Sequence, residues 1–286
     1  KKGDKRIVKH CHPKIGNQTT TCYSKKALLT MASQWNKKNP NNKIKFTKKI
    51  NKEDLWKLIR EKMSSKCNNE ICWKSVIGAS NSDYDVFKPI MPEEWYSNPR
   101  EWLSNFDIDD VMRQYEDKHQ DFKFIGPVPI DFDEELSFGH CVSDELCKIN
   151  LNSLYKKGVR YIGVIFNLDK HNQSGSHWIA MFCNLKKCEV NYWDSYGINP
   201  PKEVSKLMNR IKNQSQLIPS LRNKFVININ QKRHQFKGTE CGVYSMMFII
   251  RQLDGESFKE ITDNIIKDDE IFKKRKELFI NMKTLK

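Results

Sequence analysis

Residues that could together cleave an acyl bond occur in the second half of the chain, in the order His177, Asp194, Gln235 and Cys241. A cysteine thiolate is a strong nucleophile, and an imidazole beside it can take its proton and later protonate a leaving amine. A carboxylate on the second ring nitrogen would fix the imidazole tautomer, and a side-chain amide would stabilise a developing oxyanion. The sequence therefore predicts Cys241 as nucleophile, His177 as base, Asp194 as its orienter and Gln235 as an oxyanion donor.

The expected secondary structure brings these residues to one edge of a sheet. His177 starts a predicted strand over 177–185, and Asp194 ends the next strand over 189–194, after a short turn. Cys241 precedes an apolar helix predicted over 243–252, where free N–H groups and the helix dipole favour a thiolate. Gly242 is expected to leave room for a substrate backbone.

Each of these features also has an ordinary structural explanation. A buried cysteine before an apolar helix is usually inert, and a histidine at a strand start is usually a hydrogen-bonded structural residue. Asp194 could simply end a strand, and Gln235 could decorate a turn. Their joint order and spacing favour the catalytic interpretation. His234 is expected to point away from the site.

The segments around these residues resemble the ubiquitin-like-protein-specific cysteine proteases. The resemblance rests on His177-Trp178, on Trp193-Asp194-Ser195 and on QFKGTECGVYS, which runs from Gln235 through Cys241. Within this group the chain is most similar to the polyprotein-processing maturation proteases of African swine fever virus and related large DNA viruses, through HQFKGTECGVYS and through WLSNFDIDDVMRQYE at 102–116. Asp194 follows the cellular members, whereas the African swine fever protease has Asn at the matching position.

The resemblance implies an α+β cysteine-protease core, with a central mixed or mostly antiparallel sheet flanked by helices. It implies cleavage after Gly-Gly-Xaa sites in viral structural polyproteins during virion maturation, in the host cytoplasm (the viral factory) and in the virion. No metal or organic cofactor is required for this chemistry. A tunnel roofed by aromatic side chains would admit only residues without bulk, which is why glycines would precede the cut. Trp178 is the candidate roof, with ordinary core packing as its alternative, and Trp102 and Phe106 are candidates for the substrate groove.

The charge distribution divides the chain into two regions. Residues 1–80 contain 20 basic and 5 acidic side chains, whereas residues 81–286 contain 30 of each. We therefore expect a helical, basic N-terminal arm domain over 1–97 and a protease core over 98–286. The arm would contact DNA or a core particle nonspecifically through phosphates, and the alternative is a merely solvated lysine-rich face.

Two other functions remain open at this point. A protease that removes a ubiquitin-like modifier would use the same four residues. A zinc-bearing nucleic-acid-binding protein could use the basic region, although its cysteine spacing is irregular for zinc; the candidate ligands are His10, Cys11, His12, Cys22, Cys67 and Cys72. The nine scattered cysteines are expected to stay free thiols in a reducing compartment. No apolar run reaches about 18 residues, so membrane insertion is not expected.

Overall fold

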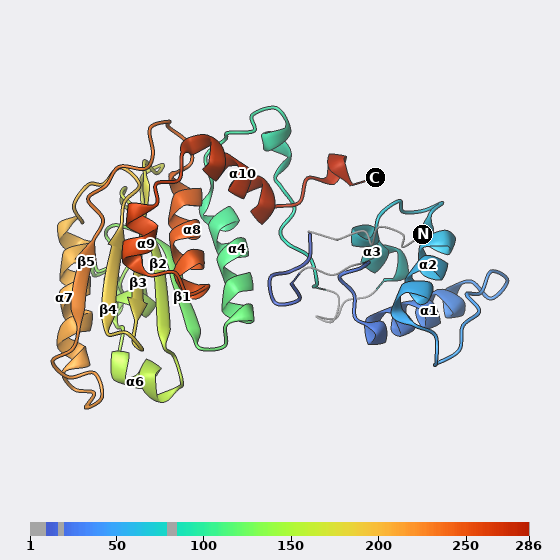
Figure 1. Cartoon of the computed structure of the whole chain (residues 1–286), viewed down its shortest axis with the longest axis horizontal. Helices are drawn as coiled ribbons and strands as arrows, with labels where there is room; N and C mark the ends of the chain where they lie inside the picture. Colours follow the sequence, from blue (N-terminus) through green and yellow to red (C-terminus); the bar gives the residue numbers. More distant parts are fainter. Residues whose placement is uncertain (1–9, 17–19, 79–84, 286) are drawn as a thin grey trace. The chain divides into compact units, whose positions relative to one another are not determined.

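The structure, a computed structural model, describes residues 10–16, 20–78 and 85–285. It divides the chain into two compact units: Lys1–Met91 with Glu277–Lys286, and Pro92–Lys276 (Figure 1). The first division lies earlier than the expected boundary between 97 and 98. The inclusion of the C-terminal segment in the first unit was not expected. A bridge between Ile90 and Ile280 joins the two ends of this unit, and sequence patterns do not reveal such a pairing.

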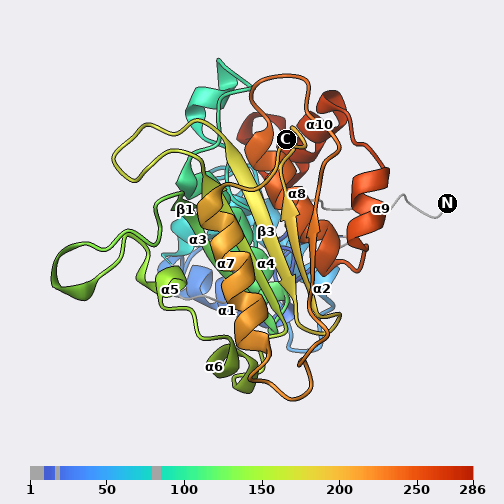
Figure 2. The same cartoon turned by 90° about the vertical axis from the view of Figure 1, so that its left-hand side faces the viewer.

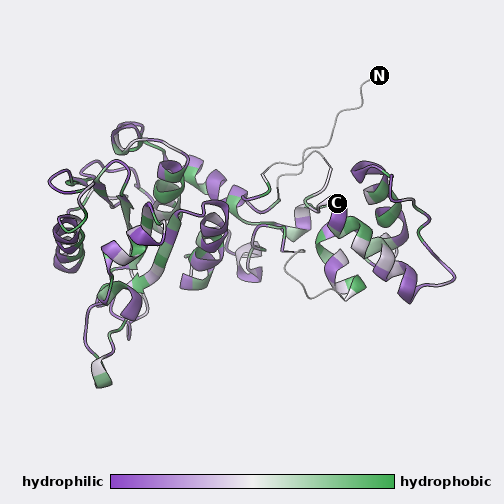
Figure 3. Cartoon of the chain, turned by 90° about the horizontal axis from the view of Figure 1, so that it is seen from below, coloured by the Kyte–Doolittle hydropathy of each residue, from purple (hydrophilic) through white to green (hydrophobic). Residues whose placement is uncertain are grey.

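The first unit is built from short helices around its own apolar core. It contains α1 (Lys25–Lys38), α2 (Lys52–Met63), the 3-10 turn η1 (Glu70–Cys72), α3 (Trp73–Ile77) and η5 (Met282–Thr284). Ser24 and Asn51 are the N-caps of α1 and α2, and each side chain accepts a backbone N–H group of the first helical turn. The helices show alternating hydrophilic and hydrophobic bands (Figure 3), and their apolar residues Leu28, Met31, Leu55 and Ile59 are buried in one cluster.

The cysteines depart from the expectation of free thiols. Cys11 pairs with Cys22, Cys67 with Cys72, and Cys141 with Cys147, which leaves Cys183, Cys188 and Cys241 as free thiols. Each disulfide closes a short local loop, so the scattered spacing that argued against a disulfide framework did not exclude these pairings.

The second unit contains a five-stranded mixed sheet in the order β1-β2-β3-β4-β5. The strands are β1 (Phe122–Pro129), β2 (Tyr161–Asn167), β3 (Trp178–Asn184), β4 (Glu189–Trp193) and β5 (Val226–Ile229). The outer pairs β1–β2 and β4–β5 are parallel, and the two central pairs are antiparallel. The α+β architecture with a mixed sheet therefore agrees with the prediction for the core.

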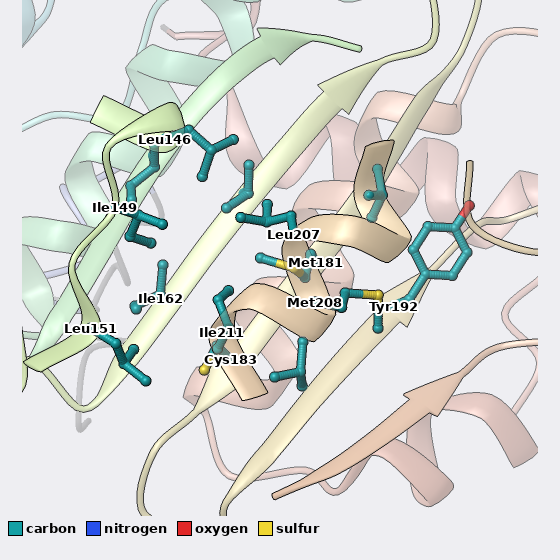
Figure 4. Close-up of a cluster of buried hydrophobic side chains, with 14 of the residues drawn as sticks. Leu146, Ile149, Leu151, Ile162, Met181, Cys183, Tyr192, Leu207, Met208 and Ile211 are labelled. Carbon is teal, nitrogen blue, oxygen red and sulfur yellow. The ribbon is translucent and has the colours of Figure 1, made fainter. Parts of the chain in front are cut away.

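Helices cover both faces of this sheet (Figure 2). One face packs against α7 (Lys202–Ser215), and Figure 4 shows Leu207, Met208 and Ile211 of α7 lying against Met181 and Tyr192. The other face packs against α4 (Asn105–Lys118) and α8 (Cys241–Leu253). The shorter helices and turns are η3 (Glu93–Tyr96), η4 (Ser137–Gly139), α5 (Asp144–Cys147), α6 (Leu151–Lys156), α9 (Phe258–Asp263) and α10 (Asp268–Leu278).

A capping box begins α4. Ser104 is the N-cap, and Asp107 completes the capping box by bonding back to Ser104. Among the described residues, no helix has the length and apolar character to span a bilayer.

Candidate active site

The strand register places His177 and Asp194 at the same end of the sheet. β3 and β4 are antiparallel, so the residue before β3 and the residue after β4 meet at one edge. The Nε2 atom of His177 lies 2.9 Å from Oδ1 of Asp194. The same carboxylate oxygen accepts the backbone N–H of Tyr196 at 2.8 Å, and Asn230 donates to the Asp194 carbonyl at 2.8 Å. These hydrogen bonds hold Asp194 in place, so its carboxylate has a fixed position relative to the imidazole.

Cys241 is the first residue of α8 and reaches the same edge. Ser245, one turn later, donates to the carbonyl oxygen of Trp178 at 3.1 Å, which fastens the start of α8 to the start of β3. The Cys241 thiol is buried and hydrogen-bonds to the His177 side chain. Because Asp194 occupies Nε2, the Nδ1 atom of His177 is the ring nitrogen left for the thiol.

The protonation of His177 follows from these contacts. Burial lowers the pKa of His177, but hydrogen bonds to Asp194 and Cys241, with the charges of both groups, outweigh burial and raise the pKa to about 9. The imidazole therefore holds its proton at neutral pH.

Gln235 lies on the loop that enters α8 and is fully buried. Ser195 donates its hydroxyl to Oε1 of Gln235 at 2.6 Å, and Nε2 of Gln235 donates to the Lys237 carbonyl at 2.6 Å. The Ser195 carbonyl also accepts the N–H groups of His234 and Gln235, at 2.8 and 2.9 Å. The amide therefore has one orientation, with one N–H of Nε2 not used by these contacts.

Gly242 serves packing at a place where the sequence suggested space for substrate. A Cβ atom there would lie 2.9 Å from Cδ1 of Leu103 and 3.2 Å from Cδ1 of Trp178. Glycine thus lets the first turn of α8 lie against these two side chains. This corrects the expectation that Gly242 leaves an open path for the substrate backbone.

The candidate substrate-binding aromatics gather near Leu103. Trp178 is only 6% exposed, and its indole N–H donates to the Leu103 carbonyl at 3.1 Å. Trp102 and Phe106, on the same segment as Leu103, are 39% and 74% exposed. Trp178 is thus held in place beside the nucleophile helix, while Trp102 and Phe106 present apolar surface.

His234 plays no part in this arrangement. Its ring is buried edge-on against Trp193 at 4.7 Å, and burial lowers the pKa of His234 to about 4, so the ring is neutral. Two neighbours of the site carried no role in the sequence interpretation. Ser195 and Tyr196 directly follow Asp194, and the only signal for them was the Trp193-Asp194-Ser195 segment.

Among the described residues, four of the six zinc ligands considered from the sequence are not free thiols. The four candidate cysteines, Cys11, Cys22, Cys67 and Cys72, are paired in disulfides and have no thiolate to donate. His10 lies near Cys22 and Glu70, but its Nε2 atom bonds to Glu70 at 3.0 Å. Glu70 also accepts from Thr21 and Trp56, so these contacts already satisfy the carboxylate.

Comparison with known proteins shows which family this chain resembles. Residues 150–285 match the Ulp1 protease family, C-terminal catalytic domain. The chain is 33% identical to a putative thiol protease of Acanthamoeba polyphaga mimivirus, over 95% of this chain and 93% of the relative. It is 28% identical to a SUMO-1 cysteine protease of African swine fever virus, over 82% of this chain and 90% of the relative.

A solved structure agrees in fold. The crystal structure of the African swine fever virus protease superposes with a TM-score of 0.66 at 24% identity, covering 96% of this chain and 97% of that one. The resemblance noted from the residues is thereby confirmed. The chain belongs to the Ulp1 protease family and is a cysteine-type peptidase.

Proposed function

We propose that the chain is an endopeptidase in which Cys241 attacks the scissile carbonyl and His177 protonates the leaving amine. The observation that carries this proposal is the contact series from Asp194 through His177 to Cys241 at the start of α8. Asp194 holds the imidazole, and Gln235 donates to the oxyanion together with the backbone N–H of Cys241. No metal or organic cofactor takes part in these steps.

The proposed substrates are viral structural polyproteins, cut after Gly-Gly-Xaa during virion maturation in the host cytoplasm and the virion. Support comes from the viral relatives and from Trp178, whose indole is fixed against Leu103 and Gly242. An aromatic wall held this firmly favours the two glycines, which have no side chains, at the positions just before Xaa. Trp102 and Phe106 would line the approach to that wall.

Removal of a ubiquitin-like modifier is the second candidate. The name of the African swine fever virus relative, a SUMO-1 cysteine protease, favours it. Both reactions use the same catalytic groups, so only the substrate separates them.

The test compares wild type and Cys241→Ala on Gly-Gly-Xaa peptides and on a ubiquitin-like conjugate. We expect wild type to cleave the peptides after Xaa, and Cys241→Ala to abolish turnover. Asp194→Ala should lower kcat by roughly 10² to 10⁴, because the nucleophile remains but the imidazole loses its orientation. Preferential hydrolysis of the conjugate would replace the first candidate with the second. Undiminished turnover by Cys241→Ala would refute both.

A further inference from the structure

Arg233 projects from the loop between β5 and α8, next to the proposed catalytic groups. Its guanidinium carbon lies 4.8 Å from the ring centre of Phe236 and 5.3 Å from that of Tyr196. Its Nε atom donates to the carbonyl of Gln235 at 2.8 Å. Two aromatic faces and one hydrogen bond to a backbone carbonyl therefore hold the exposed guanidinium of Arg233 in one place.

One aromatic ring separates this cation from the catalytic histidine. The Tyr196 ring stacks on the His177 ring, with centroids 4.7 Å apart and planes 25° from parallel. The loops that carry Tyr196 and Arg233 are also closely apposed. A Cβ atom on Gly197, whose φ is +73°, would lie 2.8 Å from the backbone of Lys232. Arg233 therefore lies beside the proposed active site.

The charge of Arg233 is unpaired among the described residues, unlike that of its neighbours. Lys232 pairs with Asp263 at 2.5 Å, and Lys237 pairs with Asp269 at 3.1 Å. The Asp268 carboxylate accepts the backbone N–H of Phe236 at 3.1 and 3.2 Å. No described carboxylate lies within ion-pair distance of Arg233, and its two terminal nitrogens remain for a ligand.

The position of Arg233 in the fold assigns it to one side of the scissile bond. Trp178, Leu103 and Gly242 meet on the side of β3 and α4, where the glycines of the substrate are proposed to lie. Tyr196 and Arg233 follow β4 and β5, on the other side of His177 in the strand order. With the glycines beside Trp178, the part of the substrate beside Arg233 would be the part that leaves with the amine.

We propose that Arg233, held between Tyr196 and Phe236, is a subsite for an acidic side chain of the substrate on the leaving-group side. A guanidinium matches a carboxylate in a bidentate pair. An extended peptide advances about 3.3–3.6 Å per residue, so the carboxylate belongs within about three residues after the cut. This inference rests on the proposed endopeptidase function.

The experiment measures kcat/KM on Gly-Gly-Xaa peptides that carry Glu, Gln or Lys at each of the three positions after the cut. We expect wild type to favour Glu over Lys at one of these positions by about three- to tenfold, and added salt to reduce the preference. Arg233→Gln should abolish the preference, and Arg233→Glu should invert it toward Lys. Arg222→Gln is the matched control, because Arg222 is also exposed and also bonds a backbone carbonyl through Nε.

The possible outcomes distinguish a failure of the proposed subsite from a failure of the proposed endopeptidase function. Cleavage of all peptides without an acidic preference, or a preference that survives Arg233→Gln, overturns the subsite and leaves the endopeptidase intact. Failure of wild type to cleave any peptide overturns both. Since the readout is a ratio between peptides for one enzyme, a general loss of activity in a variant does not imitate the expected result. If Arg233→Glu does not fold, Arg233→Gln and the salt dependence decide.

Discussion

At the scale of single residues, the surroundings of Gln235 determine which way its amide points. The Lys237 carbonyl can only accept, so Nε2 of Gln235 must face it. The Ser195 hydroxyl must then donate to Oε1. We therefore propose that Ser195 is a positioning residue that acts through Gln235 and not on the nucleophile.

This assignment predicts a specific non-additivity. Ser195→Ala should lower kcat/KM by about ten- to a hundredfold, because a buried amide oxygen loses its donor. Gln235→Ala should lower it by about 10² to 10³. Adding Ser195→Ala to Gln235→Ala should change little, since the group that Ser195 positions is already absent. Additive losses in this double-mutant cycle would show that Ser195 acts elsewhere.

Alkylation of Cys241 by iodoacetamide is the control for that cycle. The contacts of Ser195 leave the His177–Cys241 pair untouched, so the alkylation rate of Ser195→Ala should equal that of wild type. A slowed alkylation would mean that the substitution had disturbed the nucleophile itself.

The raised pKa of His177 predicts a pH-dependent contribution to stability. The folded pKa of about 9 lies above the ordinary value of 6.5, so the stabilisation is complete below about pH 6.5 and is lost as pH rises through about 9. Asp194→Asn removes one of the groups that raise the pKa. The gap in unfolding free energy between wild type and Asp194→Asn should therefore shrink from about pH 6 to about pH 10 in denaturant titrations. A difference in unfolding free energy that stays constant over this pH range would contradict the role of Asp194 in raising the pKa of His177.

The proposed catalytic residues could be named from the sequence because their types and order are informative by themselves. Ser195, Tyr196 and Arg233 could not, because their roles come from contacts. Ser195 and Gln235 are 40 residues apart in sequence. A serine, a tyrosine and an arginine on loops have many ordinary explanations, and only their neighbours in space distinguish these three.

At the scale of elements, a buried ion pair connects the nucleophile helix to two other segments. Glu240, the residue before Cys241, is fully buried and lies 3.3 Å from Arg275 on α10. Arg275 also donates to the Glu101 carbonyl and stacks on Trp95 with its guanidinium carbon 3.9 Å from the ring centre. One arginine thus holds the start of α8 against the segment that carries Trp102.

Removing this arginine should be costly because the buried Glu240 carboxylate then keeps only its longer contact with Arg100, at 3.7 Å. Arg275→Met should lower the free energy of unfolding by about 3–5 kcal/mol, the usual cost of breaking a buried pair. Arg275→Met with Glu240→Gln should recover part of the loss, since no buried charge is then left without its partner. Denaturant unfolding of the two variants measures the difference. If the double variant were no more stable than Arg275→Met, the charge of Glu240 would not be the cause.

The elements differ in how well sequence predicted them, for physical reasons. The strands expected over 177–185 and 189–194 and the apolar helix expected over 243–252 were predicted with nearly correct bounds, because each is a continuous apolar run. They correspond to β3, β4 and α8. β1 was not predicted, because Gly126, Pro127 and Pro129 within it argue against a strand. β1 tolerates prolines because it is an edge strand, paired only with β2. Edge position depends on the whole sheet and is not visible in the segment itself.

At the scale of the whole molecule, the two units differ in charge as well as in fold. The excess of basic residues lies in 1–80, and the remainder of the chain is balanced. The connection between α1 and α2 is an example of this basic excess. Four lysines are exposed there: Lys43, Lys45, Lys48 and Lys49. We propose that this region contacts polyanions such as DNA through phosphates, independently of sequence.

Substitution of these four lysines by Gln in the full chain tests that contact without deleting a unit. Each phosphate contact contributes about −0.9 to the slope of log K against log salt on duplex DNA. Loss of several contacts should therefore weaken binding at low salt and flatten the slope by a similar amount per lysine. The matched control replaces four exposed lysines of the second unit by Gln: Lys156, Lys157, Lys202 and Lys206. Equal losses in both variants would point to a general charge effect, whereas an unchanged slope in the first variant would rule out this loop as the contact.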